Sequence, residues 1–294
     1  MGRAANPGPT LWPVLALTLN ALIWGLSWWP LRQLQAQGLH PLWTTALVYI
    51  LVVGVITVAR PQAWGQLWRA PALWVLVVAA GTTNASFNWG VTVGDVVRVV
   101  LLFYLMPLWS VLLAWALLGE RLSARTGLRV GLSLLGAVVV LWPEGGGWPL
   151  PRSLPEWLGV LGGFSFALNN VMLRREARQP KAARALAMFG GGALVAGVLA
   201  WGMSSSGHAP WPPAPAPAWV LGAVALAGAF LVGNLALQYG AARLPASVTA
   251  VVMVTEVLFA SVSAVLLGAG VLNLQLLLGG VFIVGATVMA ALKD

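Results

Sequence analysis

A small number of amide side chains stand within long apolar runs and could bind polar groups. Asn84 and Asn88 lie one helical turn apart, and Asn234 and Gln238 repeat them 150 residues later. Polar side chains are costly against lipid, so we expect these four to point inward and to contact a cargo or its water-filled path. The alternative is that they form hydrogen bonds between helices, which stabilise membrane proteins modestly.

Glu256 is the only acidic residue deep within an apolar run, about ten residues from either end. A carboxyl group near the middle of a membrane is protonated, paired or exposed to water. It could couple transport to protons, contact the ammonium group of a substrate, or hold a fixed hydrogen bond to a neighbouring helix. The sequence leaves these three roles open.

Aromatic and further amide residues accompany these groups. Phe87 shares the helical face of the first amide pair, and Tyr104 lies in the next apolar run. Both could offer an aromatic surface to a substrate, and simple packing is the alternative. Trp24 and Asn169 extend the predicted substrate-binding set. Asn170 follows Asn169 directly, and adjacent helical residues point about 100° apart, so at most one of the two should face a cavity squarely.

Pro107 and Arg98 are the candidate gating residues. Pro107 removes a backbone hydrogen bond, so it should kink its helix and could act as a hinge, although proline is also common in membrane helices for structural reasons. Arg98 could attract a substrate carboxylate at the outer mouth. The alternative is that Asp95 caps the helix and forms a local pair with Arg98.

No pattern typical of an enzyme is found. The two histidines, His40 and His208, are far apart in sequence, and there is no nucleophile–base pair, phosphate loop or metal-ligand spacing. Cysteine is absent, which excludes disulfides, thiolate chemistry and cysteine metal sites. We therefore expect no catalytic site, no cofactor and no metal.

The composition indicates a membrane protein. Apolar residues make up 60% of the chain and charged residues 8%, compared with about 25% charged residues in soluble domains. Ten apolar segments, each near the length that crosses a bilayer core, are predicted to be transmembrane helices. They run over residues 11–31, 41–59, 71–91, 95–118, 127–142, 154–173, 185–202, 218–241, 246–267 and 272–292.

The 16 basic residues set the predicted orientation. With the N-terminus in the cytoplasm, 13 of them lie on the inner side, while Arg32 and Arg152 fall in outer loops and Arg98 within a span. The positive-inside rule therefore favours both termini in the cytoplasm. This distribution accounts for the net charge of +9 without nucleic acid as a partner.

The two halves of the chain resemble each other weakly. Gly240 matches Gly90 at the same 150-residue spacing, and residues 70–76 echo residues 216–221. Five is an odd number of spans, so the second copy must enter the membrane from the opposite side, as in the inverted repeats of many transporters. The predicted fold is all-α and integral to the membrane, with ten transmembrane helices as two inverted five-helix repeats around a central cavity. The predicted parts are residues 1–142 as the first repeat, 143–155 as an outer linker and 156–294 as the second repeat.

Several motifs fit this arrangement. Pro107 lies midway through the fourth span, and Leu118-Gly119-Glu120-Arg121 closes it at the cytoplasmic end. With the two five-span halves, these marks resemble the drug/metabolite transporter superfamily in its ten-span EamA-type form. In the second half Glu256 matches the family's usual acid, but Val257 replaces the proline that usually follows, and Ala269-Gly270 replaces the closing Gly-Glu. The run GDVVRVVLLFYLMPLW is similar to the aromatic amino-acid exporters of the YddG type.

The resemblance implies a central cavity lined by spans 1, 3, 4, 6, 8 and 9. We predict an exporter of small amphipathic metabolites, foremost amino acids including aromatic ones, that works by alternating access between the two repeats. Other cargo of the same superfamily, such as drugs or nucleotide-linked metabolites, is the first alternative, and a membrane enzyme or scaffold is the second.

The expected location is a bacterial-type cytoplasmic membrane, which the protein crosses many times. The expected partners are a small-molecule substrate and the lipid bilayer, with no nucleic acid. A monomer is compatible with the pattern.

Overall fold

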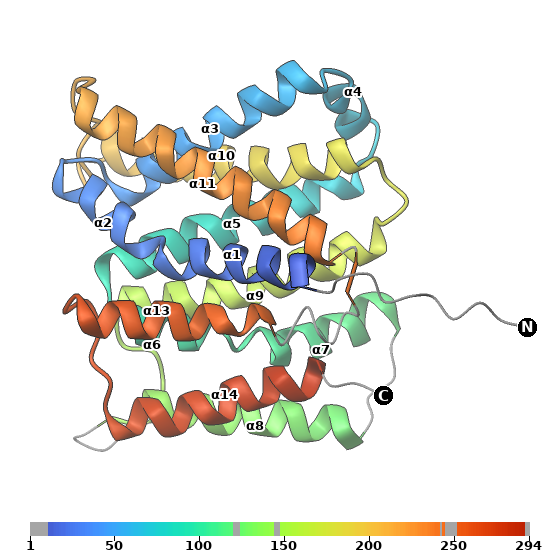
Figure 1. Cartoon of the computed structure of the whole chain (residues 1–294), viewed down its shortest axis with the longest axis vertical. Helices are drawn as coiled ribbons and strands as arrows, with labels where there is room; N and C mark the ends of the chain where they lie inside the picture. The colour runs from blue at the N-terminus through green and yellow to red at the C-terminus, as the bar shows by residue number, and fades with distance from the viewer. Residues whose placement is uncertain (1–10, 120–123, 144–147, 242, 245–251, 292–294) are drawn as a thin grey trace, which may run out of the picture.

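The computed structural model describes residues 11–119, 124–143, 148–241, 243–244 and 252–291. All regular elements within these ranges are helices (Figure 1). They are α1 (Leu11–Leu26), α2 (Trp28–Ala36), α3 (Pro41–Ala59), α4 (Gln62–Trp68), α5 (Ala72–Val93), α6 (Val96–Phe103), α7 (Met106–Leu118), α8 (Ala124–Leu141), α9 (Leu154–Arg175), α10 (Lys181–Ser205), α11 (Pro217–Ala241), α13 (Thr255–Leu266) and α14 (Leu274–Ala291). Glu120 and Arg121, and the side chains of Pro107 and Gln238, lie outside the described part of the chain.

Each of the ten predicted apolar segments contains a helix, the ninth over its described residues. A helix pairs its own backbone groups, which suits segments with so few polar side chains. The first, fourth and ninth segments are interrupted, the ninth at Val254 directly before α13. The fourth breaks between Phe103 and Met106, at the place where Pro107 can offer no N–H to the Phe103 carbonyl. This is the interruption that the sequence predicted for Pro107.

The first segment differs from its prediction as one helix ending at Leu31. Instead α1 stops at Leu26, and α2 continues to Ala36. Pro30 cannot donate a backbone hydrogen bond to Leu26, which removes one link across the break. The Ser27 hydroxyl donates to the Trp24 carbonyl at 2.7 Å and satisfies part of the opened backbone.

Five helical stretches, two of them containing the breaks described above, are long and apolar enough to cross a membrane, and the count becomes six if α4 and α5, bent by 106°, form one span. These stretches are Leu11–Ala36, Pro41–Ala59, Val96–Leu118, Lys181–Ser205 and Pro217–Leu237. Helices α8, α13 and α14 contain shorter apolar stretches of 10–17 residues. The count of ten spans therefore stays a prediction.

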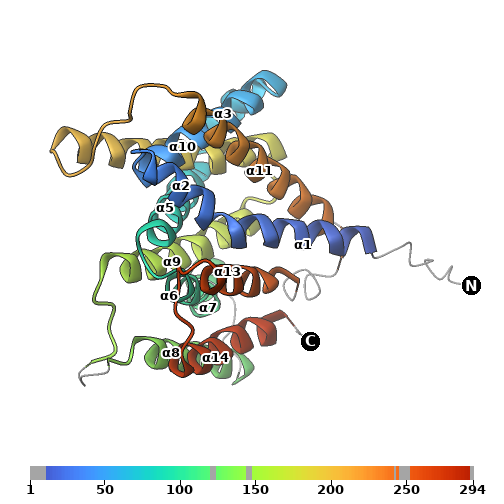
Figure 2. The same cartoon turned by 60° about the vertical axis from the view of Figure 1, so that its left-hand side comes forward.

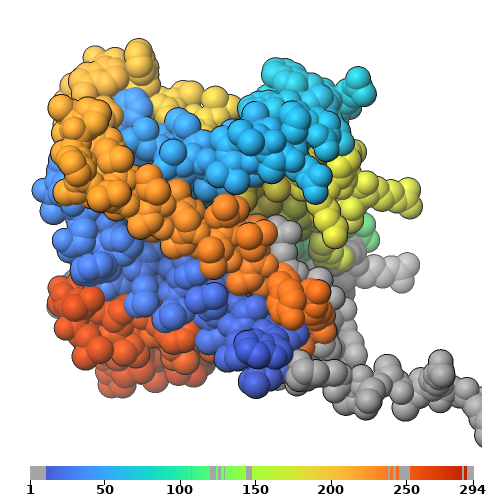
Figure 3. All heavy atoms as spheres, turned by 45° about the horizontal axis from the view of Figure 1, so that its top comes forward, coloured from blue at the N-terminus to red at the C-terminus, as the bar shows by residue number. Residues whose placement is uncertain are grey.

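The helices run side by side, with α3, α4 and α10 at one end of the long axis and the pair α8–α14 at the other (Figure 1). Between them, α9 packs against α5, α6 and α7, while α1 packs against α11 and α13. In the space-filling view α11 crosses the face beside α1, and α13 lies beyond α1 (Figure 3). The middle of the bundle is thus built from helices of both halves.

The ends of the helices fall on two opposite sides. The start of α1, the helix α4, the connection from α9 to α10 and the end of α14 share one side, and α2 and α6 lie toward the other (Figures 1 and 2). The first side carries Arg60 and Arg69 next to α4, and Arg174, Arg175 and Arg178 next to α10. We call it the arginine-rich side. It is the side that the charge pattern predicts to face the cytoplasm.

Candidate functional site

A cavity of about 350 Å³ lies among the helices. Side chains from α1, α3, α5, α6, α7, α9, α10, α11 and the start of α13 line it. The expected lining of spans 1, 3, 4, 6, 8 and 9 is therefore extended by α3 and α10, the second and seventh segments. The predicted substrate-binding residues that line the cavity are Trp24, Asn84, Phe87, Tyr104, Asn169, Asn234 and Glu256.

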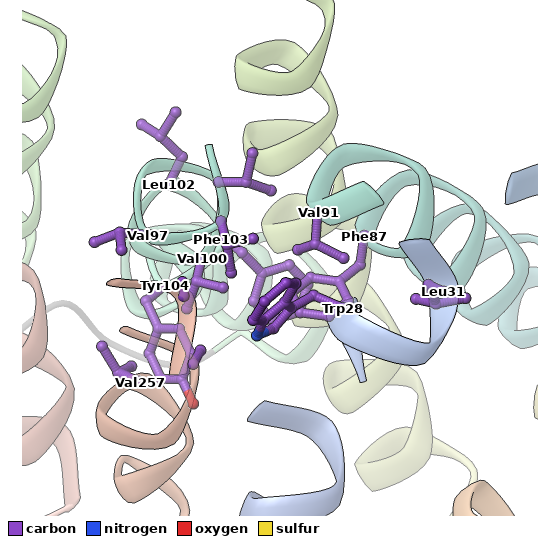
Figure 4. Close-up of a cluster of buried hydrophobic side chains, with 14 of the residues drawn as sticks. Trp28, Leu31, Phe87, Val91, Val97, Val100, Leu102, Phe103, Tyr104 and Val257 are labelled. Atoms are coloured by element: carbon purple, nitrogen blue, oxygen red, sulfur yellow. The ribbon is translucent and has the colours of Figure 1, made fainter. Parts of the chain in front are cut away.

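Two helix interruptions place Tyr104 and Glu256 at the cavity. Tyr104 occupies the turn between α6 and α7, and Glu256 lies in the first turn of α13. The Tyr104 hydroxyl donates to Glu256 Oε2 at 3.1 Å and lies 3.3 Å from the Met253 carbonyl oxygen. Figure 4 shows Tyr104 extending toward the helix that carries Val257. The fourth and ninth segments therefore meet at the cavity through a hydrogen bond.

Aromatic rings form most of the wall. The rings of Trp24 and Phe230 stack with centroids 4.5 Å apart and an interplanar angle of 13°. Phe87 meets Phe103 edge to face at 4.9 Å, and Phe166 lies 5.4 Å beyond Phe103. Such aromatic pairs contribute stabilisation beyond that of the apolar area they bury. These contacts therefore hold the rings of the cavity wall in place.

The polar groups of the wall are mainly amides. Asn84 Oδ1 accepts a hydrogen bond from the Tyr49 hydroxyl, and its Nδ2 donates to the Ala80 carbonyl at 2.7 Å. Asn20 Nδ2 donates to the Gly233 carbonyl at 2.7 Å. In contrast, Asn20 Oδ1 and Asn169 Oδ1 are buried without a hydrogen-bond partner within the described residues. Both oxygens belong to side chains of the cavity lining, so they are candidate acceptors for a ligand.

Asn88 does not line the cavity, contrary to the expectation. Its side chain is fully buried, and Nδ2 donates to the Thr45 hydroxyl on α3 at 3.1 Å. Four helical residues turn through about 400°, so Asn88 is rotated away from Asn84 by about 40°. That rotation directs Asn88 to the neighbouring helix, which is the hydrogen-bonding alternative. The side chain of its counterpart Gln238 lies outside the described part, although its backbone belongs to α11.

Arg98 lies apart from the central cavity. Its Nη1 pairs with Glu156 Oε1 at 2.9 Å, and its Nη2 donates to the Val140 carbonyl at 2.8 Å. Asp95 Oδ1 accepts from the Arg98 backbone N–H at 2.8 Å, so Asp95 caps α6 as the structural alternative proposed. The local ion pair expected between Asp95 and Arg98 is replaced by the pair with Glu156. Arg98 instead lines a second cavity of about 400 Å³ with Arg152 and Glu156.

Sequence reasoning missed much of the lining. Tyr49, Phe103 and Phe230 sit in apolar runs, where an aromatic residue gives no sign of whether it faces lipid, core or cavity. Asn20 lies one helical turn before Trp24, and this spacing was the sequence signal that Asn20 could line the cavity together with Trp24. Asn169 and Asn170 both contribute to the lining of the cavity, and the expectation that at most one of them faces it squarely stays a prediction.

Comparisons with known proteins agree with a membrane transport fold. The model of the EamA-like transporter family matches residues 11–142. The chain is 28% identical over 163 residues to "Protein RarD" of Streptomyces exfoliatus, covering 52% of this chain and 48% of that protein. It thus spans about half the length of this curated relative. A solved structure, "Crystal structure of protein", is similar at 20% identity with a TM-score of 0.55, covering 95% of this chain and 96% of the other.

These findings support three conclusions. The chain is a multi-pass membrane protein, because it has several helices that could span a bilayer and matches the EamA-like transporter model over its first half. Its fold resembles a known structure along nearly its whole length. The chain is similar to the EamA-like family of the drug/metabolite transporter superfamily, and these matches support no particular branch of that family.

Proposed function

We propose that this protein transports small amphipathic metabolites, amino acids including aromatic ones foremost, by alternating access around the central cavity. The observation that carries the proposal is the cavity itself. It combines an aromatic wall with convergent polar side chains, lies between two interrupted helices, and has a volume of about 350 Å³ that suits a small metabolite. Interrupted helices around a binding site near the membrane midplane are typical of secondary transporters.

The inverted repeat has support from helix pairing. Helix α5 packs on α9, and α11 packs on α1. Helices α6 and α7 also pack on α9, and α13 packs on α1. When each of the first five predicted spans is exchanged with its counterpart among the last five, the α5–α9 contact becomes the α11–α1 contact. In the same way, the contact of α6 and α7 with α9 becomes the contact of α13 with α1. The EamA-like match ends at residue 142, where the first repeat is predicted to end.

Matched glycines support the same relation. A Cβ built on Gly90 would lie 3.4 Å from Leu158 Cβ and 3.5 Å from the Pro155 carbonyl oxygen. A Cβ built on Gly240 would lie 2.5 Å from Leu17 Cγ and 2.8 Å from the Pro13 carbonyl oxygen. Glycines 150 residues apart thus face the same kinds of group, a proline carbonyl and a leucine at the start of α9 or α1, although the approach is closer at Gly240 than at Gly90.

Equivalent interruptions are a further point of support. Helix α7 begins after Leu105 and α13 after Val254, and both of these N-cap residues have helical backbone angles. The two breaks are 149 residues apart in sequence. Val257 occupies the position of Pro107, so the second break forms without a proline. This is within one residue of the 150-residue spacing expected if the fourth and ninth spans perform equivalent movements.

The conformation is best interpreted as facing the cytoplasm. The proposal is supported by Asn169, Asn170 and Met188, which line the cavity from the ends of α9 and α10 that lead to their connection on the arginine-rich side. On the opposite side Trp28 Nε1 donates to Ser263 at 3.0 Å, and the Val96 N–H donates to the Ala269 carbonyl at 3.3 Å. Buried side chains including Trp28, Leu31 and Val91 fill this region (Figure 4).

Counterflow in proteoliposomes tests the proposal. Vesicles loaded with unlabelled amino acids, amines or other small metabolites should accumulate the matching labelled compound faster than vesicles without protein. A Trp24→Ala variant should lose most of this exchange, because it removes the stacked partner of Phe230 from the wall. If no compound of the panel exchanges faster than in empty vesicles, the function is instead that of a membrane enzyme or scaffold.

A further inference from the structure

We infer that the central cavity selects cargo carrying a primary ammonium group on an aromatic or apolar body, and that it discriminates against a carboxylate on the same molecule. The inference rests on the proposed function, since it names the class of compound that the same cavity binds. Within the small amphipathic metabolites, it shifts the preferred cargo from free amino acids, which are zwitterions, to amines and amino-acid derivatives that carry a net positive charge.

The charge of the lining is the first observation. Glu256 is the only ionisable acid or base of Asp, Glu, Lys, Arg or His type among the described residues that line the cavity. Residues 245–251, which lie outside the described part, contain no charged residue in the sequence. Arg98, the basic residue predicted to serve a substrate carboxylate, is paired with Glu156 around a different cavity. A bound carboxylate would therefore find no cationic side chain in the described lining.

Hydrogen bonding is the second observation. Asn20 and Asn169 each leave Oδ1 buried without a partner, and both side chains are at least nine-tenths buried. The orientation of Asn20 is fixed, because only Nδ2 can donate to the Gly233 carbonyl. Both orphaned atoms are acceptors. An ammonium group has three donors and no acceptor, so it complements them, whereas a carboxylate has acceptors only.

The hydrogen-bond donors that are already occupied also favour an ammonium group over a carboxylate. The Tyr49 hydroxyl donates to Asn84, the Tyr104 hydroxyl donates to Glu256, and Asn84 Nδ2 donates to the Ala80 carbonyl. Both hydroxyl donors are therefore already used within the protein, as is one N–H of the Asn84 amide. A carboxylate would have to break such a bond to gain a hydroxyl donor, while an ammonium group would leave all of them intact.

The aromatic wall completes the complementarity. Trp24 and Tyr104 present rings to the cavity, and ring faces attract cations most strongly when water is excluded. Gly25 follows Trp24, and a Cβ built there would lie 2.9 Å from the Glu256 carbonyl oxygen, so α1 and α13 approach closely beside the acid. A lone buried carboxylate is costly, and a bound ammonium group would offset that cost.

Calorimetric titration of the purified full-length protein with four compounds that share a phenyl group tests the inference. They are phenethylamine, phenylalanine, 3-phenylpropionate and 2-phenylethanol, which at neutral pH are a cation, a zwitterion, an anion and a neutral compound. We expect phenethylamine to bind at least about tenfold more tightly than phenylalanine and 3-phenylpropionate, because a buried charge gains from a partner and loses without one. Equal or tighter binding of phenylalanine or 3-phenylpropionate would overturn the inference, and this comparison needs no variant.

Two glutamate variants then test whether the preference for an ammonium group comes from Glu256. Glu256→Gln should weaken phenethylamine about tenfold or more and leave 2-phenylethanol within about twofold. Glu156→Gln makes the same substitution at a carboxyl outside the central cavity and should leave both unchanged. Unchanged phenethylamine binding by folded Glu256→Gln would contradict the inference. The inference would also be contradicted if Glu156→Gln lost phenethylamine binding while Glu256→Gln kept it. Counterflow separates the two claims: exchange of phenylalanine with no preference for amines refutes only this inference, whereas no exchange of any compound refutes the transport function.

Discussion

Two asparagines one turn apart on α5 provide a sharp test of which polar groups serve transport. Asn84 lines the cavity, whereas Asn88 is buried against Thr45 on α3. Replacing each by leucine removes the same amide from the same helix. We expect Asn84→Leu to impair transport and Asn88→Leu to leave it nearly intact.

The magnitudes follow from the contacts that each variant loses. Asn88→Leu removes a hydrogen bond between helices, worth about 0.6 kcal/mol in membranes, together with a buried oxygen that has no partner. Thr45 keeps its hydrogen bond to the Pro41 carbonyl at 2.9 Å. Stability should therefore fall by less than about 1 kcal/mol. Asn84→Leu leaves the buried Tyr49 hydroxyl without its acceptor at the cavity wall, a loss of about 1–3 kcal/mol.

Counterflow in proteoliposomes measures the difference. The half-saturating cargo concentration should rise about tenfold or more for Asn84→Leu, because the cargo loses an amide partner at the cavity wall and a hydrogen bond of about 1.4 kcal/mol corresponds to a factor of ten. It should change less than about threefold for Asn88→Leu. Thermal unfolding in detergent must show that both variants are folded. Equal transport defects in the two variants, or a normal Asn84→Leu, would refute the assignment of Asn84 to the cavity and of Asn88 to packing.

Three further predictions concern sidedness, closure and pH. In this cysteine-free chain, Arg178→Cys should resist an impermeant thiol reagent on intact cells while Ser206→Cys reacts, and the opposite pattern would reverse the orientation. Arg32 donates to the carbonyls of Val91 and Gly94, so Arg32→Ala should weaken the outer closure and raise outside labelling of Val91→Cys by about tenfold, whereas Gln33→Ala, at an exposed neighbour, should not. Burial lowers the pKa of His40, whose Nδ1 accepts from the Leu42 N–H at the start of α3. The unfolded chain therefore binds this proton more readily, and the unfolding temperature should fall as pH drops below about 6.5. His40→Asn, which can still cap the helix, should reduce this dependence, and an unchanged pH profile would show that His40 is not its source.

The sequence was sufficient for the features that depend on local composition. Apolar runs without charges had to become helices, because a helix is the local way to pair every backbone group. Pro107 marked the break between α6 and α7, because the missing N–H is a property of the residue itself. The arginines predicted to lie inside share one side of the helices where they are described. Amides and an acid in apolar runs also identified Asn84, Asn169, Asn234 and Glu256 as cavity residues, because burying them elsewhere would be costly.

The tertiary structure decided the features that depend on rotation and on distant partners. A period of 3.6 residues places Asn84 and Asn88 on one broad face, but the position of α3 determines that Asn88 bonds to Thr45. The partner of Arg98 is Glu156, 58 residues away, and no local pattern shows this pairing. Tyr49 and Phe230 enter the wall because α3 packs against α11, which brings their rings to 6.0 Å, and an aromatic residue in an apolar run suits lipid, core or cavity equally well. The sequence determines which groups must avoid lipid, whereas only the packing of the helices determines whether each one meets another side chain or the space left for cargo.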